Sequence, residues 1–207
     1  MKYQKFNAEH TFFTSDTHFN HENIIKFCDR PFSTINEHND FLIEKWNSIV
    51  SDADTVFHLG DFAFGGFPVW EEIRPRLNGS IYLIQGNHDF HNSSQNNQRL
   101  LKMFKDVQWQ MHISIDEQPI ILTHFPLLCY NGTFSKRPTW NLHGHVHSRK
   151  GGIGKDDKRC EEYCWPSQYD VGVDCNNYTP ISFKELQEKM KFQIENNVNF
   201  YHWINNG

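Results

Sequence analysis

The segment HTFFTSDTH, residues 10–18, contains the first strong strand signal of the chain. Its aromatic and β-branched residues favour an extended, half-buried backbone. The strand ends in a polar turn that carries Asp16 and His18, and both residue types bind metal ions. In open α/β sheets the carboxyl ends of the strands converge on the functional site. The segment therefore predicts a strand with a functional site at its carboxyl end.

Four later segments also combine an apolar strand with polar residues at its end. Each polar residue on its own fits ordinary turn chemistry or a structural histidine. A protein core, however, has no use for Asp, His and Asn at five strand ends in turn, so the joint pattern indicates a shared site. The four segments are DTVFHLGD (54–61), SIYLIQGNHD (80–89), PIILTH (119–124) and TWNLHGHVH (139–147).

Helices are expected between the strands. Thr34 and Ser182 each stand three residues before a glutamate, which is the capping-box pattern that starts a helix. Pro68 is placed to open a short helix that ends near Leu77, and residues 94–104 are predicted to be helical. The apolar positions expected to be buried are Phe41, Leu42, Trp46, Ile49 and Val50 after Thr34, and Phe183, Leu186, Met190 and Ile194 after Ser182.

The strands at 107–115 and 119–124 are expected to form a hairpin around the turn residues Asp116–Pro119. Strands that alternate with helices, followed by hairpin-connected strands, predict a mixed α/β fold. The 207 residues suit one domain, 1–207. The segment at about 148–168 is charged and rich in glycine, and we predict a surface insertion there.

The composition argues against several classes of protein. The net charge is −5 with neutral histidines, so no global basic field would attract nucleic acid. We expect neither a signal peptide nor a transmembrane helix, because the chain lacks apolar runs of the required length. The five cysteines are odd in number and scattered, which favours reduced thiols in a cytoplasmic protein. Cys160 and Cys164 form the one close pair, which is weak evidence for zinc.

The ordered set D-x-H, G-D, G-N-H-D, H and G-H-x-H, which spans Asp16 to His147, resembles the calcineurin-like metallophosphoesterase superfamily. The run TSDTHFNHENIIKFCDRPF (14–32) is similar to small stand-alone bacterial and phage members. The resemblance implies a sandwich of two mixed β-sheets flanked by helices, with a two-metal site at the strand carboxyl ends. It also implies an enzyme that hydrolyses phosphate esters.

The resemblance carries over to this chain residue by residue, and no ligand position of the family is missing. Asp61 would bridge the two metals, because a carboxylate has two oxygens. The first metal would be held by Asp16, His18, Asp61 and His147, and the second by Asp61, Asn87, His124 and His145.

The ligand set suits phosphoester hydrolysis. Two divalent cations outweigh the charge of two aspartates and a bridging hydroxide, so a positive centre would face the phosphate. The hydroxide would attack phosphorus while the metals neutralise the phosphoryl oxygens. His88 follows a ligand, and an imidazole there suits transition-state contact or protonation of the leaving group. Nitrogen and oxygen ligands indicate Mn²⁺, Fe²⁺, Zn²⁺ or Ni²⁺, and we expect Mn²⁺ to support activity in vitro.

Substrate contacts are predicted near the first motif. Asn20 and His21 follow it, where a loop can reach the phosphate, and Arg30 could clamp a phosphate oxygen with its guanidinium fork. The basic residues of the insertion could grip a longer polyanion, although a solvated loop is the simpler interpretation. We favour a phosphodiesterase on a nucleotide or short nucleic acid, because the small chain leaves little room for a cap over the site. Neither a membrane nor a protein partner is implied.

Three alternatives differ in function. A phosphomonoesterase would act on a small phosphorylated metabolite. A non-catalytic scaffold would hold metal and bind a protein partner, but the complete ligand set argues against it. A metal-dependent amidohydrolase would place His-x-His at its first strand, whereas His-x-His comes last in this chain.

The segment NLHGHVHS (141–148) places three histidines at alternate positions, on one face of an extended chain. His145 and His147 belong to the ligand pattern. His143 stands before Gly144 and outside that pattern, so we predict a packed histidine whose loss mainly costs stability.

Overall fold

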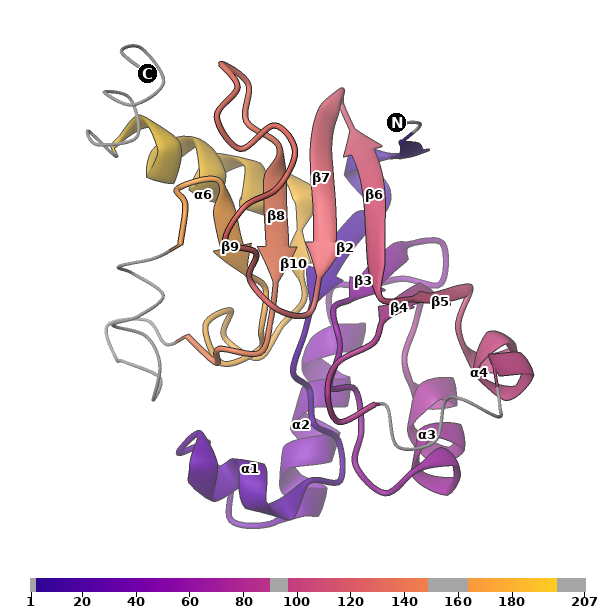
Figure 1. The fold of residues 1–207 in the computed structure, drawn as a ribbon. Helices are drawn as coiled ribbons and strands as arrows, with labels where there is room; N and C mark the ends of the chain where they lie inside the picture. Colours follow the sequence, from indigo (N-terminus) through magenta and orange to yellow (C-terminus); the bar gives the residue numbers. More distant parts are fainter. Residues whose placement is uncertain (1–2, 90–96, 149–163, 197–207) are drawn as a thin grey trace.

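The computed structural model describes residues 3–89, 97–148 and 164–196. Within these residues the strands form two five-stranded sheets (Figure 1). The first sheet has the order β10-β2-β3-β4-β5, with β2 at Thr11–Thr14, β3 at Thr55–His58, β4 at Ser80–Ile84, β5 at Asp106–Gln108 and β10 at Ile181–Ser182. The second has the order β1-β6-β7-β8-β9, with β1 at Gln4–Phe6, β6 at Gln110–Ile115, β7 at Gln118–Thr123, β8 at Trp140–His143 and β9 at Gln168–Asp170.

Both sheets are mixed. In the first, β2 to β5 run parallel and the edge strand β10 runs antiparallel to β2. In the second, β6 and β7 are antiparallel, while β1 with β6, β7 with β8, and β8 with β9 are parallel. Because parallel neighbours end at the same edge of a sheet, the carboxyl ends of β2, β3 and β4 lie side by side. The predicted sandwich of two mixed sheets is confirmed.

The predicted hairpin forms, with a shorter turn than expected. Asp116 and Glu117 make a two-residue turn with φ of 47° and 63°, and Ile115 pairs with Gln118. The strand predicted over 107–115 is wrong in extent, because it is divided between the sheets: β5 joins β4, and β6 joins β1 and β7. The alternation of apolar residues continues across Trp109, so the sequence does not indicate that the chain passes from one sheet to the other there.

The core between the sheets follows from the two-residue repeat of the strands. Phe13 of β2 and Phe57 of β3 are fully buried and pack in one core with Leu122 of the second sheet. The two phenylalanine rings stack with their centroids 5.6 Å apart. On the other face of the first sheet, Val56 and Ile81 pack in a second core that includes residues of the helices α2 (Ile35–Asn47) and α3 (Phe67–Ile73). Burial on both faces explains why these strands are almost continuously apolar.

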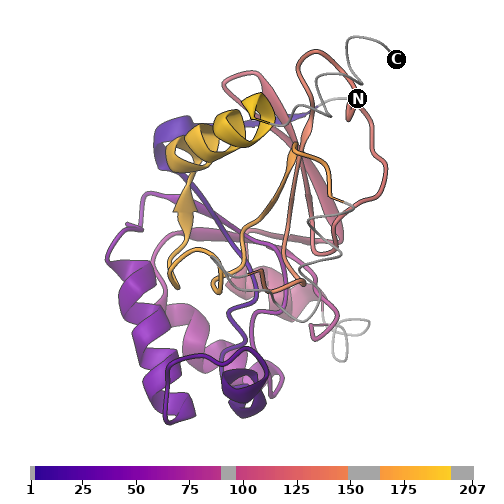
Figure 2. The same ribbon diagram turned by 90° about the vertical axis from the view of Figure 1, so that its left-hand side faces the viewer.

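Helices lie on both sides of the first sheet (Figure 2). The hydroxyls of Thr34 and Ser182 each accept a hydrogen bond from the amide of the glutamate three residues on, which confirms both predicted helix starts. Pro68 lies in the first turn of α3, also as predicted. The helices are α1 at Glu22–Phe27, α2 at Ile35–Asn47, α3 at Phe67–Ile73, α4 at Asn97–Met103 and α6 at Phe183–Glu195, with short 3₁₀ turns at Ala8–His10 and Arg74–Arg76.

One predicted core position is wrong. Ile49 is 42 % exposed, because it lies beyond Asn47, the last residue of α2, and no longer follows the buried face of that helix. Leu42 and Trp46 are buried as expected. Among the described helices, none combines the length and apolar character that a membrane crossing requires.

The predicted insertion falls mainly on residues 149–163, which lie outside the described residues. Cys160, one of the close cysteine pair, is among them. Ser167 is fully buried, and Gln168 already belongs to β9. The chain has therefore rejoined the second sheet by residue 168.

Candidate metal centre

The predicted ligands gather where the carboxyl ends of the strands meet. Oδ2 of Asp61 lies at the centre of this group, 3.5 Å from Nε2 of His18 and 3.6 Å from Nε2 of His124. Side chains from both sheets therefore face a common space. The positions are Asp16 and His18 after β2, Asp61 after β3, Asn87 and His88 after β4, His124 after β7, and His145 and His147 after β8.

Asp16, His18 and His147 offer three ligand atoms that lie within 4.8 Å of one another. Oδ1 of Asp16 is 4.0 Å from Nε2 of His18 and 3.8 Å from Nε2 of His147. The two imidazole rings stack with centroids 5.2 Å apart. With Asp61 beside His18, these are the residues predicted for the first metal.

Asp61, Asn87 and His124 form a second, contiguous group. Nε2 of His124 lies 3.0 Å from Oδ1 of Asn87 as well as 3.6 Å from Asp61. The His145 ring is more exposed, and its centroid is 5.2 Å from that of His124. The structure therefore brings together three of the four residues predicted for the second metal and places His145 at their outer side.

The ring nitrogens of this cluster fit cations that would sit among them. Nε2 of His18 is buried and has no hydrogen-bond partner among the described residues. His124 donates through Nδ1 to the carbonyl oxygen of Leu59 at 2.7 Å, and Nδ1 of His147 is hydrogen-bonded to Asp174. Occupying Nδ1 in this way leaves the Nε2 lone pair for a cation, as in most metal-ligating histidines. The donor set therefore fits divalent metal ions.

The backbone that carries the ligands adopts conformations that are rare outside glycine. Five predicted ligands, Asp16, His18, Asp61, His145 and His147, are among the described non-glycine residues with positive φ, at angles between 48° and 70°. Such conformations cost about 1–3 kcal/mol each and cluster at functional sites.

Gly86 allows close packing around the ligand cluster, because it has no side chain. A Cβ atom at this position would lie 2.2 Å from Oδ1 of Asp61. The glycine therefore allows β4 to end directly beside the central carboxylate.

The electrostatics of the cluster favour bound cations. Burial raises the pKa of Asp16 to about 6. Burial also lowers the pKa of His18 well below its ordinary value, so this ring is neutral and has a free lone pair. Burial disfavours the charged form of His147 too, but Asp16 and the hydrogen bond to Asp174 outweigh it and raise the pKa to about 11. The proton on His147 thus balances carboxylate charge that a metal ion would balance.

Arg30 does not occupy the position predicted for a phosphate clamp. It is 3 % exposed, and two of its nitrogens donate to the carboxylate of Asp174 at 2.9 and 2.7 Å. It also donates to the backbone carbonyl oxygens of Asp16 and Thr17. The guanidinium is thus engaged by one carboxylate and two carbonyl oxygens. It ties the first ligand loop to Asp174.

Asp174 supports the predicted ligand His147, although none of the sequence motifs includes it. Its Oδ2 accepts hydrogen bonds of 2.7 Å from both Arg30 and His147. Burial raises the pKa of Asp174, but these two cations outweigh it and hold the pKa well below the usual range. The segment YDVGVD (169–174) carries a signal that would have found it, since apolar residues alternate there and the run ends in aspartate.

Cys28 borders the same network. Its Sγ atom is 3.3 Å from Nδ1 of His147, and the thiol, this ring and Asp174 could also hold a metal. Asp174 is also paired with Arg30, so its carboxylate is already shared between two side chains.

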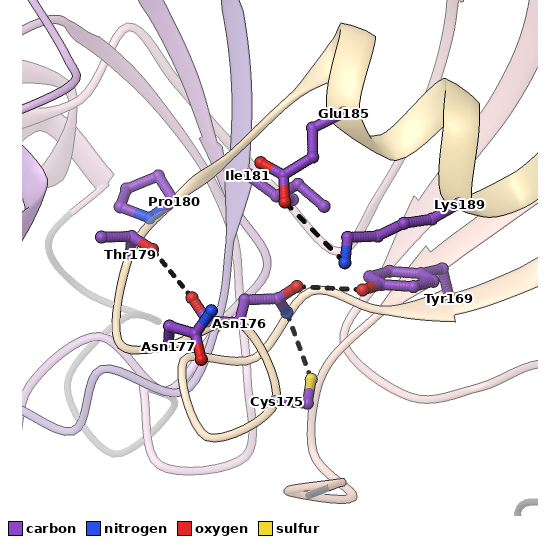
Figure 3. Close-up of a pocket in the computed structure, with 9 residues that line it drawn as sticks. All are labelled: Tyr169, Cys175, Asn176, Asn177, Thr179, Pro180, Ile181, Glu185 and Lys189. Atoms are coloured by element: carbon purple, nitrogen blue, oxygen red, sulfur yellow. Dashed lines mark hydrogen bonds and ion pairs between the residues drawn. The ribbon is translucent and has the colours of Figure 1, made fainter. Parts of the chain in front are cut away.

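The loop that carries Asp174 is also fixed from its other side. Nδ2 of Asn176 donates to the carbonyl oxygens of Asp170 and Gly172. The Tyr169 hydroxyl donates to Oδ1 of Asn176 (Figure 3). Tyr169 and Asn176 line a cavity of about 280 Å³, which α6 borders with Glu185 and Lys189. No predicted metal ligand lines this cavity, so its wall contributes to the centre by holding the loop.

Asp89 and His143 lie close to the ligands but support the backbone. The carboxylate of Asp89 accepts hydrogen bonds from the amides of Asp61, Phe62 and Gly86. His143 is buried in β8, and its Nδ1 lies 3.1 Å from the carbonyl oxygen of Gly144.

The remaining predicted site residues are placed in three different ways. His88 is at the exposed edge of the cluster, with Nε2 4.0 Å from Oδ2 of Asp61. His21 is buried behind His18, and their Nδ1 atoms are 3.2 Å apart. The side chain of Asn20 donates to the carbonyl oxygen of Phe64. Asn20 therefore acts on a neighbouring loop rather than on the ligand cluster.

Comparisons with known proteins identify relatives of this chain. An uncharacterized protein of Methanocaldococcus jannaschii is 33% identical over 174 residues, which cover 81% of this chain and 84% of that protein. The Gene 66 protein of Mycobacterium phage L5 is 28% identical over 164 residues, with 67% and 77% covered. A crystal structure of a protein of unknown function from Aquifex aeolicus has a TM-score of 0.66 and 26% identity, covering 86% of this chain and 97% of that one.

The model of the family described as calcineurin-like phosphoesterase matches residues 10–200, which include every strand end of the metal-ligand cluster. The match and the ligand geometry point to the same chemistry. This chain belongs to the calcineurin-like phosphoesterase family and is a metal-dependent phosphoric ester hydrolase.

Proposed function

We propose that this protein is a two-metal phosphodiesterase that acts on a nucleotide or a short nucleic acid. The observation that carries the proposal is the position of Asp61. Its Oδ2 atom lies at nearly equal distances, 3.5 and 3.6 Å, from a histidine of each predicted ligand group. A carboxylate in this position can bind one cation through each oxygen.

Asp16, His18, Asp61 and His147 would hold the first metal, and Asp61, Asn87, His124 and His145 the second. Mn²⁺ is the ion we expect to support activity, and the same donors accept Fe²⁺, Zn²⁺ or Ni²⁺. When bound, the two ions would generate a nucleophile from water near neutral pH and neutralise charge on the phosphoryl oxygens.

The chain's own residues orient and complete this chemistry. The fixed Nδ1 atoms of His124 and His147 aim their rings at the space beside Asp61. His88 stands at the exposed edge of that space, within reach of a substrate bound there. Its imidazole would contact the transferring phosphoryl group or protonate the leaving oxygen. His21 supports His18 from behind, as a positioning residue.

A reducing, cytoplasmic compartment is part of the proposal. The described cysteines at positions 28, 129 and 175 are free thiols. Free thiols persist where glutathione and thioredoxin keep cysteines reduced.

Hydrolysis of bis(p-nitrophenyl) phosphate with added Mn²⁺ tests the proposal, with p-nitrophenyl phosphate as the monoester comparison. The wild type should cleave the diester faster, and Asp61→Ala should abolish turnover. Asp40→Ala is the matched control, because Asp40 is an exposed aspartate whose partner is Arg76. Absence of hydrolysis with Mn²⁺, or full activity of Asp61→Ala, would refute the proposed two-metal hydrolysis. Preference for the monoester would refute the phosphodiesterase.

A further inference from the structure

Two phenylalanine side chains stay exposed directly beside the metal-ligand cluster. Phe64 follows the Asp61 turn and is 48 % exposed, and Phe125 follows His124 and is 43 % exposed. Exposing a phenylalanine forgoes the stabilisation that its burial would give. Both rings border residues that we assign to the reaction, so their exposure calls for a functional explanation.

Phe64 borders His21 and His88, the two histidines next to the first ligand group. Its ring stacks on that of His21 with centroids 4.6 Å apart and an angle of 16°, and it lies 6.2 Å from the ring of His88. The backbone below it is fixed at two points. The amide of Phe64 donates to the carbonyl oxygen of Phe19, and its carbonyl oxygen accepts from the side chain of Asn20. Phe64 is therefore an exposed aromatic ring on a fixed backbone.

Phe125 borders the second ligand group in the same manner. Its ring makes edge-on contacts with His145 at 4.5 Å and with His124 at 4.9 Å between centroids. The hydroxyl of Thr123 donates to the carbonyl oxygen of Phe125 at 2.7 Å, and Thr123 in turn accepts a hydrogen bond from Asn141. This ring too is exposed and fixed from behind.

The two rings lie on different flanks of the central carboxylate. The Phe64 ring contacts His21, His21 contacts His18 of the first group, and His18 lies beside Asp61. Phe125 reaches it through His124, which belongs to the second. A phosphodiester bound over Asp61 would carry one substituent toward each flank. Each substituent would then meet an exposed aromatic ring.

We propose that Phe64 and Phe125 are stacking platforms for the two bases that flank the scissile phosphodiester of a single-stranded nucleotide substrate. The proposal rests on the phosphodiesterase function above and names its substrate class. Every base has a π-face, so stacking on fixed aromatic rings binds single strands with little sequence preference. The net charge of −5 favours this source of affinity over a general attraction for phosphates.

The test compares two dinucleotide phosphodiesters with the same sugar-phosphate backbone. One carries two adenines, and the other carries tetrahydrofuran residues that lack bases. With Mn²⁺ present, Phe64→Leu and Phe125→Leu should each lower kcat/KM for the adenine dinucleotide by a factor between 5 and 150, the equivalent of about 1–3 kcal/mol of stacking per base. The loss should appear mainly in KM. Turnover of the abasic diester should change by less than about twofold.

Matched variants separate stacking from other effects of the rings. Phe64→Trp and Phe125→Trp should restore the low KM, because they keep an aromatic face. Phe192→Leu is the control, since Phe192 is an exposed aromatic residue on α6. It should leave both substrates unaffected. Fluorescence of a 2-aminopurine dinucleotide reports stacking without turnover, and its quenching should weaken in both leucine variants.

Three results would overturn the inference. The wild type could cleave the abasic and adenine dinucleotides equally well. A leucine variant could lose activity equally on both, which would make its ring a support for the neighbouring histidine. The third is undiminished quenching in the leucine variants. The first two results presuppose cleavage of bis(p-nitrophenyl) phosphate, and the third needs no turnover, so failure of the stacking proposal is distinguishable from failure of the phosphodiesterase function.

Discussion

The carboxylate of Asp174 accepts a 2.7 Å hydrogen bond from Nδ1 of His147 and leaves Nε2 of the same ring facing Asp16. Asp174→Asn should therefore weaken Mn²⁺ binding by about 10- to 100-fold, the usual effect of removing a hydrogen-bond partner behind a metal ligand. Isothermal titration with Mn²⁺ measures the loss. Asp54→Asn, at a buried aspartate that bonds Ser51 and His10, should bind the metal normally.

Asp174→Asn also leaves the charge of Arg30 unpaired, so a second variant separates folding from metal binding. Combining Arg30→Met with Asp174→Leu removes both charges and should recover much of the stability. This double variant should still bind Mn²⁺ weakly. Wild-type affinity in it would show that the hydrogen bond to His147 does not position the ring.

Arg30 distinguishes a structural ion pair from a phosphate clamp. Arg30→Ala leaves the carboxylate of Asp174 buried without its partner, which should cost about 3–5 kcal/mol of unfolding free energy. Arg30→Lys keeps the charge but loses the guanidinium fork and should cost less. Urea unfolding in the presence of a chelator measures both. Unchanged stability with a raised KM for the diester would instead indicate direct phosphate binding.

The three aligned histidines should separate into ligands and a packed residue. His145→Ala and His147→Ala should lose metal and activity. His143→Ala should keep its metal and lose about 1–3 kcal/mol of stability, because it empties a buried position in β8. Metal content by mass spectrometry, measured beside thermal unfolding, checks all three. Loss of metal from His143→Ala at normal stability would assign that ring to the centre.

His58 makes stability depend on pH. Its Nε2 lies 2.9 Å from the hydroxyl of Thr17, its Nδ1 accepts from the amide of Gly60, and burial lowers its pKa from 6.5 to about 3. Between these values the unfolded chain binds a proton that the folded chain does not. The stability contributed by the neutral ring is therefore complete above pH 6.5 and is lost as the pH falls, by up to about 1.4 kcal/mol per unit.

His58→Gln provides the comparison for this pH dependence. Its amide can still donate to Thr17 but does not titrate. Urea unfolding of wild type and variant between pH 4 and pH 8 should give a stability difference that narrows as the pH falls. Parallel curves over this range would contradict the assignment of a neutral, buried imidazole.

The metal-ligand cluster was largely predictable because its signals are local. Each ligand directly follows an apolar strand, as Asp16 follows Thr11–Thr14, and parallel pairing then brings the strand ends together without further information. Arg30 and Asp174 are separated by 144 positions, and no local pattern connects them. The role of Arg30 depends on its burial beside Asp174. The sequence around Arg30 predicts a surface turn instead, so this burial could not be predicted.

The errors in the fold have a similar cause. The run over 107–115 alternates like one strand, but Trp109 is where the chain leaves the first sheet for the second. Ile49 continues an apolar pattern beyond the point at which α2 ends. In both cases tertiary packing, rather than local periodicity, sets the boundary.

The central claim is that Asp61 joins two metal sites into one reaction centre. Titrating metal-free protein with Mn²⁺ while following hydrolysis of bis(p-nitrophenyl) phosphate tests it most directly. The rate should reach its maximum when two ions are bound per chain. A maximum at one ion per chain, or full hydrolysis in excess chelator, would contradict it.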